Sequence, residues 1–196
     1  MFPTFNSVGA QGPTGPTGPV ALAAGAIIPF ASGLVPLVLT TTVPLLGIGD
    51  PLTVGLVGFG SNAPSVPIVD VVTGALGLPN FAFTVPRAGT ITDISALFIP
   101  TVALTLLTGT ATVNATVYLA APGSNSFLPT SASVNLAPPL TGATLPGTVL
   151  SGVADGLAVP LVDGNRILLV FSVTLAGGID VAAVVIGTAS AGINIV

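Results

Sequence analysis

The chain has 196 residues, of which 51% are hydrophobic and only 4% are charged, and its formal net charge is -4. An ordinary soluble domain carries about 25% charged residues, so the sequence predicts a protein that covers much of its surface with other molecules. Two cationic side chains in the whole chain exclude the basic surface that nucleic-acid binding requires.

A membrane span is not expected. A spanning helix needs about 20 consecutive apolar residues, and the long apolar stretches are interrupted, as at Pro36, Thr40 and Pro44. Aromatic residues make up 5% of the chain, too few for the aromatic belts that mark membrane interfaces. The apolar composition therefore indicates an oligomer whose partner is a further copy of itself.

Residues 1–8 form a leader that carries Phe2, Pro3 and Phe5. Two large aromatic rings without a neighbouring charge indicate a segment that docks on another molecule. We expect these three residues to join one trimer to the next.

Residues 9–20 repeat Gly-x-y, with Gly9, Gly12, Gly15 and Gly18 at every third position. Only Gly fits at the axis of a triple helix, and Pro presets the backbone angle that its strands need. The repeat predicts a collagen-like stub in which Thr14 and Thr17 expose their hydroxyls as candidate glycosylation sites. Four triplets are too few to hold three chains together, so residues 21–196 must form a head that trimerises.

The head reads as all-β. Short runs of Val, Ile, Leu, Thr and Phe alternate with Gly, Pro, Asn and Asp, and no sustained helical periodicity appears. Eight to ten strands of this length are typical of a jelly-roll sandwich. The Asp163-Gly164 pair predicts a hairpin between residues 157–162 and 166–174. The expected strands are Leu52–Phe59, Pro67–Val72, Phe81–Val85, Gly89–Phe98, Thr110–Leu119, Arg166–Thr174, Asp180–Gly187 and Ile193–Val196.

Residues 167–171 and 181–186 are apolar at every position rather than at alternate ones. A sandwich whose sheets each face water on one side needs alternation. We therefore expect neighbouring subunits of a closed trimer to cover the outer face of these strands.

The sequence offers little for catalysis. It contains no His, Cys, Lys or Glu, so the usual general bases and most activated nucleophiles are missing. The Gly-rich run 55–60 has no Lys and no βαβ context, and it reads as strand and turn glycine rather than as a cofactor loop. No enzyme activity and no cofactor are expected.

The few charges have a structural interpretation. Asp50, Asp155 and Asp163 stand beside Pro or Gly, where Asp side chains bond the local backbone. The six Asp are isolated from one another, so no metal site is predicted, although an axial ion held by three chains stays open.

The two cations, Arg87 and Arg166, either pair with Asp93 or Asp163 or reach across a subunit boundary, and the sequence favours pairing. Asn114-Ala-Thr116 matches a glycosylation sequon but falls inside an expected strand.

Several runs resemble one family. They are the Gly-Pro-Thr repeats, Ala26–Gly33, Gly58–Asn62, Phe83–Ile91, Leu168–Ser172 and Ser190–Ile195. Together they are similar to the collagen-like exosporium glycoproteins of Bacillus spores, especially the B type. The resemblance implies a collagen stalk that ends in a trimeric, tumour-necrosis-factor-like jelly-roll head on the spore surface. The stub is shorter than the family's stalks, and the leader is shorter and poorer in Pro, which favours a fibre subunit such as that of an endospore appendage.

Two functions follow as hypotheses. The first is a structural subunit of a spore-surface fibre or exosporium layer, which contacts itself and other coat proteins. The second is a trimeric head that recognises a host or environmental ligand.

Overall fold

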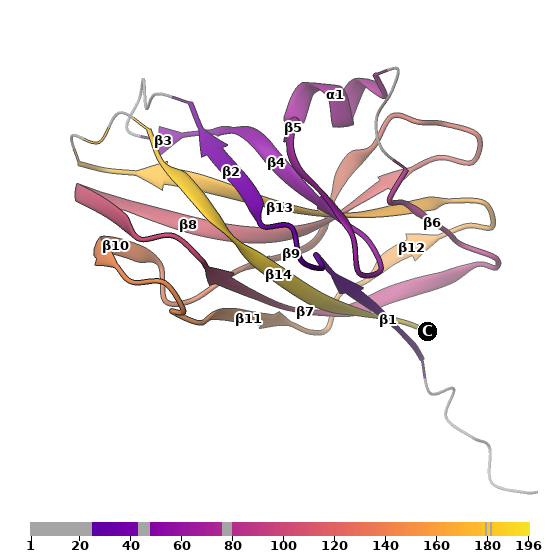
Figure 1. Ribbon diagram of the computed structural model, residues 1–196. Helices are drawn as coiled ribbons and strands as arrows, with labels where there is room; N and C mark the ends of the chain where they lie inside the picture. Colours follow the sequence, from indigo (N-terminus) through magenta and orange to yellow (C-terminus); the bar gives the residue numbers. More distant parts are fainter. Residues whose placement is uncertain (1–24, 43–47, 76–79, 179, 181) are drawn as a thin grey trace, which may run out of the picture.

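The computed structural model describes residues 25–42, 48–75, 80–178, 180 and 182–196, and strands dominate them (Figure 1). The all-β class predicted from the sequence is confirmed. The elements, in chain order, are β1 (Ala26–Ala31), β2 (Leu37–Thr41), β3 (Ile48–Gly49), β4 (Pro51–Val57), β5 (Asn62–Pro67), α1 (Ile68–Thr73), β6 (Phe83–Thr84), β7 (Gly89–Pro100), β8 (Leu104–Ala120), β9 (Leu128–Asn135), β10 (Leu140–Thr144), β11 (Leu150–Ala154), β12 (Val159–Leu161), β13 (Arg166–Ala176) and β14 (Val184–Ile195).

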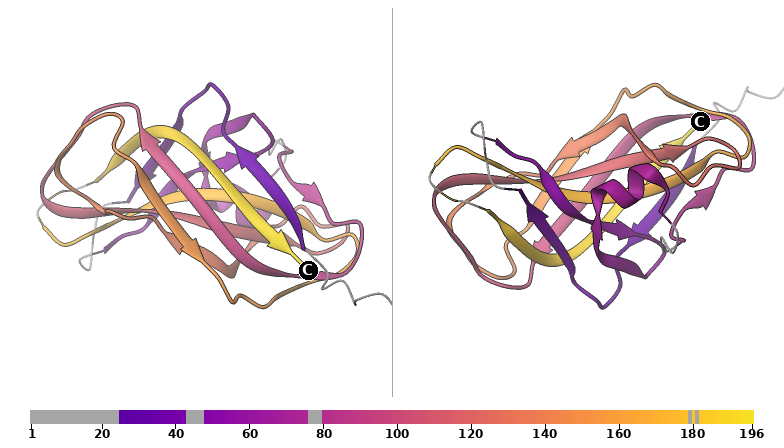
Figure 2. Two further views of the ribbon diagram at one scale, coloured as in Figure 1. Left: turned by 90° about the horizontal axis from the view of Figure 1, so that it is seen from below. Right: turned by 90° about the horizontal axis from the view of Figure 1, so that it is seen from above.

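The strands join into one continuous antiparallel sheet that folds over on itself. Its hydrogen-bonded order is β10-β8-β13-β4-β2-β14-β7-β11, and the shorter strands attach at the sides. Two long pairs form its halves, β8 with β13 and β7 with β14. The rings of Phe98 in β7 and Phe171 in β13 lie 6.3 Å apart, so the two halves face each other as the layers of a sandwich (Figure 2).

The main core fills the space between these layers. Leu169, Phe171 and Val173 of β13 are fully buried in it. Along β8 the buried side chains alternate with half-buried Thr and Asn, the period of two that a strand with one covered face requires.

A second apolar cluster covers the outer face of β13. Leu168 and Val170 point away from the main core and pack with Val71 of α1, Val66 of β5 and Phe127. The prediction that a neighbouring subunit covers residues 167–171 is therefore wrong, because α1, β5 and the segment before β9 cover this strand within the same chain (Figure 1).

The strand predicted at Pro67–Val72 is wrong too, because its residues form α1. Their β-branched side chains favour a strand, but packing overrides that preference. The helix starts after Pro67 and buries Val71. It ends at Gly74, whose φ of 70° is left-handed, and a Cβ there would lie 2.6 Å from the carbonyl oxygen of Asn125.

The hairpin predicted at Asp163-Gly164 is wrong in its pairing. A turn does form, closed by the bond from the Asn165 N–H to the Val162 carbonyl at 3.1 Å. The strands on either side of it pair elsewhere, β12 with β7 and β13 with β8. The turn therefore carries the chain from one layer to the other.

Three further strand predictions had wrong bounds. Residues 180–187 and 193–196 were expected as two strands, but β14 runs unbroken from Val184 to Ile195. The strand expected at 81–85 shrinks to β6, Phe83–Thr84. Residues 188–192, which were expected to separate the two strands, belong to β14. The run 55–60 is strand and turn, as predicted.

Candidate functional site

The docking, collagen-like and glycosylation residues predicted from the sequence lie outside the described residues. These are the docking residues Phe2, Pro3 and Phe5, the stub glycines Gly9, Gly12, Gly15 and Gly18, and the candidate glycosylation sites Thr14 and Thr17. The structure instead brings forward two surfaces at the end of the sandwich where described residue 25 and the C-terminus lie together.

The first surface, the open face, is the outward side of the layer that β1, β14, β7 and β11 form (Figure 2, left). The registers between these strands place their alternate residues on it. Asp93 is its one charged residue, and the others are apolar, small or hydroxyl-bearing. They are Ile27, Pro29 and Ala31 of β1, Val184, Ile186, Thr188, Ser190, Gly192 and Asn194 of β14, Ser95, Leu97 and Ile99 of β7, and Ser151 and Val153 of β11.

A groove of about 200 Å³ runs across the open face. Ile27 and Val153 form its two walls and expose 76% and 69% of their surface. Gly192 and Ser95 lie between them, and the exposed lining is almost wholly apolar. Exposed apolar side chains around an apolar lining are typical of a surface that another protein covers.

Asp93 lies at one end of the groove and carries its one charge. Its carboxylate accepts hydrogen bonds from the Thr92 hydroxyl at 2.6 Å and from the Asn194 amide at 3.1 Å. These two bonds lower the pKa of Asp93 below its ordinary value. The carboxylate is thus held within its own chain, and the expected pair with Arg87 does not form.

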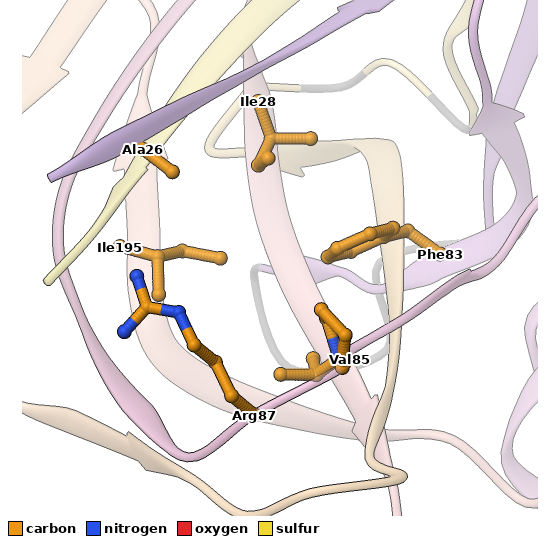
Figure 3. A pocket seen from close by; sticks show the side chains of 7 residues that line it. Ala26, Ile28, Phe83, Val85, Arg87 and Ile195 are labelled. Carbon is orange, nitrogen blue, oxygen red and sulfur yellow. The ribbon is translucent and has the colours of Figure 1, made fainter.

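The second surface is a pocket of about 130 Å³ between the layers (Figure 3). Ile28 and Ile195 line it from one side, and Phe83 and Val85 from the other. The exposed Arg87 lies at its rim, with the guanidinium beside Ile195 (Figure 3). The pocket therefore combines apolar walls with one cation.

Arg166 is used in a different way. Its guanidinium donates to the Asn125 and Asn80 side-chain oxygens at 2.8 Å each and to the Ser124 carbonyl at 3.2 Å. It also lies 5.1 Å from the centre of the Phe127 ring. Within the described part of the chain neither arginine forms an ion pair, so the predicted pairing with Asp93 or Asp163 is wrong. Neutral amides and a ring satisfy Arg166 instead.

Among the remaining acids, Asp180 lies between β13 and β14 and binds the backbone of β8. Its carboxylate accepts the backbone N–H groups of Leu107, Thr108 and Gly109 at 2.8, 3.1 and 2.6 Å. The bonds from Leu107 and Gly109 lower the pKa of Asp180. Asp50, Asp155 and Asp163 are exposed in connecting segments.

The sequon asparagine, Asn114, lies inside β8 and is half-buried. Its amide donates to the Ser133 hydroxyl at 3.0 Å and to the Asn135 side-chain oxygen at 2.8 Å. Over the described ranges, no three potential ligands gather into a metal site, and no helix has the length and hydropathy to cross a membrane.

Of the residues that line the groove, Asp93 was named from the sequence as a candidate ion-pair partner, and no binding surface was predicted there. One signal for them was present, because Thr188, Ser190 and Gly192 alternate with buried residues of β14. A strand whose outward positions are small rather than charged indicates a face that another surface approaches closely.

Comparison with known proteins gives one relative. The chain is 34% identical over 160 residues to "Collagen-like protein 1" of Acanthamoeba polyphaga mimivirus, in an alignment that covers 77% of this chain. It spans only 16% of that relative's length. No family model matches the chain. The sequence is thus similar to a collagen-like protein over most of its length.

Proposed function

We propose that this chain is a non-enzymatic structural subunit of a spore-surface fibre or exosporium layer. Its head, a jelly roll of the tumour-necrosis-factor type, forms a homotrimer, and residues 9–20 wind into a short collagen-like triple helix. The observation that carries the proposal is the open face, which presents a single charge, at Asp93, across four strands. The collagen-like relative supports the same class of protein.

The trimers join through their leaders. Phe2, Pro3 and Phe5 of one trimer dock on the next, and the stub holds three leaders side by side. One short arm binds weakly because ordering it costs backbone entropy, but after the first arm has docked the others are present at high effective concentration. The combined binding of three arms therefore stabilises the contact between one trimer and the next.

Two measurements on the purified full chain test this function. Light scattering should give the mass of a trimer, and electron microscopy should show trimers joined end to end. A variant lacking residues 2–8 should remain trimeric and lose the end-to-end contacts. A monomeric full chain would refute the trimer, and unchanged filaments without the leader would refute the joint.

A second function, a trimeric surface-displayed binding or adhesion head, is favoured by the pocket at Arg87 (Figure 3). Its apolar walls and single cation suit a ligand that has an apolar body and an anionic group. Electron microscopy separates the two functions, because an adhesion head would appear as isolated trimers at concentrations at which a fibre subunit assembles.

A further inference from the structure

Gly192 occupies the middle of β14 without a reason inside its own chain. A glycine in a strand interior forgoes side-chain packing and costs backbone entropy. Seventeen other glycines are explained within the chain. Those with left-handed φ angles need that conformation, and at the rest a Cβ would lie under 3.0 Å from another atom, for example 2.4 Å from the Ile99 oxygen at Gly187. At Gly192 φ is not left-handed, and a Cβ would meet only the Ile27 Cγ2 atom, at 3.8 Å.

The chain leaves the head beside this glycine. Gly25 is packed against Asn194, which lines the groove together with Gly192 and Ile27. The last Gly-x-y triplet ends at residue 20. Five steps along the chain span at most about 18 Å at 3.3–3.6 Å per residue, so the last triplet lies within that distance of Gly25.

This proximity selects the surface that faces the threefold axis. A collagen-like repeat requires three chains at one axis, so the three copies of Gly25 must lie near that axis. The open face and its groove adjoin Gly25, whereas the outer face of β13 is covered by α1 within the chain. A head joined to the stub over so few residues therefore turns the groove towards its neighbours.

We infer that the groove over Gly192 receives a second copy of this chain, and that the missing side chain lets the neighbour approach the backbone of β14 between Ile27 and Val153. The inference rests on the proposed trimer and names its contact surface. A heterologous contact of this kind, repeated by a threefold rotation, closes after three copies and leaves no free groove.

The first test fills the groove in the full chain. Gly192→Ala and Gly192→Leu are compared with Thr112→Leu, which adds the same kind of side chain to the outer face of β8. Thr112 is half-buried and lies on the layer opposite the groove. Light scattering over a dilution series gives the mass and the dissociation constant, and circular dichroism reports whether each variant is folded.

The expected result is a trimer for the wild type and for Thr112→Leu, and a folded monomer for Gly192→Leu at micromolar concentration. Gly192→Ala should weaken association about tenfold or more. Should Gly192→Leu misfold, the alanine variant decides, because its Cβ has room in its own chain. An alanine variant with the wild-type dissociation constant would overturn the inference and leave the trimer standing, whereas a monomeric wild type would remove the trimer itself.

The second test requires no loss of stability. The chain contains no cysteine, so a single cysteine reports on one position. Ser95→Cys exchanges a hydroxyl for a thiol of similar size in the groove lining, and it should react with a maleimide at least about tenfold more slowly in the trimer than after dilution to monomer, while Thr112→Cys should react at the same rate in both. Equal rates for Ser95→Cys in trimer and monomer would show that the neighbour binds elsewhere.

Discussion

Replacing Phe171 with Ala tests whether the two layers share one core. The side chain is fully buried and touches the opposite layer at Phe98, with the ring centres 6.3 Å apart. Removing about 150–200 Å² of buried apolar area at about 25 cal/mol per Å² predicts a loss of about 4–5 kcal/mol. Measured Phe→Ala changes in cores fall at about 3–5 kcal/mol, so we expect a loss of about 4 kcal/mol.

Urea denaturation at one fixed protein concentration measures this loss, since association shifts apparent stability. Phe59→Ala is the matched control, because that ring stacks on Phe30 at 5.2 Å but remains 58% exposed. We expect the control to lose about 1 kcal/mol or less. If Phe171→Ala were to cost no more than the control, the placement of β13 between the core and the second cluster would be refuted.

Three further predictions concern the polar contacts. Asp180→Asn should lower the melting temperature at pH 7 by weakening the hydrogen bonds from the backbone of residues 107–109. Because folding lowers the pKa of Asp180, the stabilisation by its carboxylate is present above about pH 4 and is lost as the pH falls below that. The melting temperatures of the wild type and the variant should therefore converge in acid. Arg166→Ala should lower the free energy of unfolding, measured by urea denaturation, by about 1–3 kcal/mol. Arg166→Lys should recover only part of this loss, because an ammonium lacks the planar guanidinium that binds two amides and lies over Phe127. Full recovery by Lys would contradict this. Asn62→Ala should raise amide hydrogen exchange in residues 32–35, because its side-chain amide donates to two carbonyls of that turn. Unchanged exchange would show that the turn needs no such support.

The fold class could be predicted from the sequence, but the pairing of the strands could not. The period-two alternation along β8 and the apolar run of β13 depend on local burial, so residues 110–119 and 166–174 were placed correctly. The turn at Asp163-Gly164 was also visible, yet its neighbours pair with strands more than 40 residues away in sequence. Turn chemistry decides where a chain reverses, whereas pairing depends on contacts that no local pattern encodes.

The helix α1 shows why propensity failed where it did. Residues 67–72 read as a strand because four of the six are β-branched and apolar. In the fold they follow β5 at the edge of the sheet, where the apolar outer face of β13 needs a cover. A helix closes over Leu168 and Val170 with Val71, and the carbonyl of Val71 accepts the N–H of Phe127 at 3.1 Å. The apolar face that this helix covers belongs to β13, about 100 positions later in the sequence, so a pattern within residues 67–72 could not reveal it.

The molecule has two kinds of apolar surface, which differ in whether the chain itself covers them. On the outer face of β13 the large aliphatic side chains are Leu168 and Val170, and α1 and β5 cover them within the chain. The open face instead carries small and hydroxyl-bearing residues between Ile27 and Val153, and nothing in the described part of the chain lies over it. Large side chains suit a permanent core, whereas small ones let two backbones approach closely. The residue types of the two layers thus distinguish the surface that the chain buries alone from the surface that it offers to a second copy.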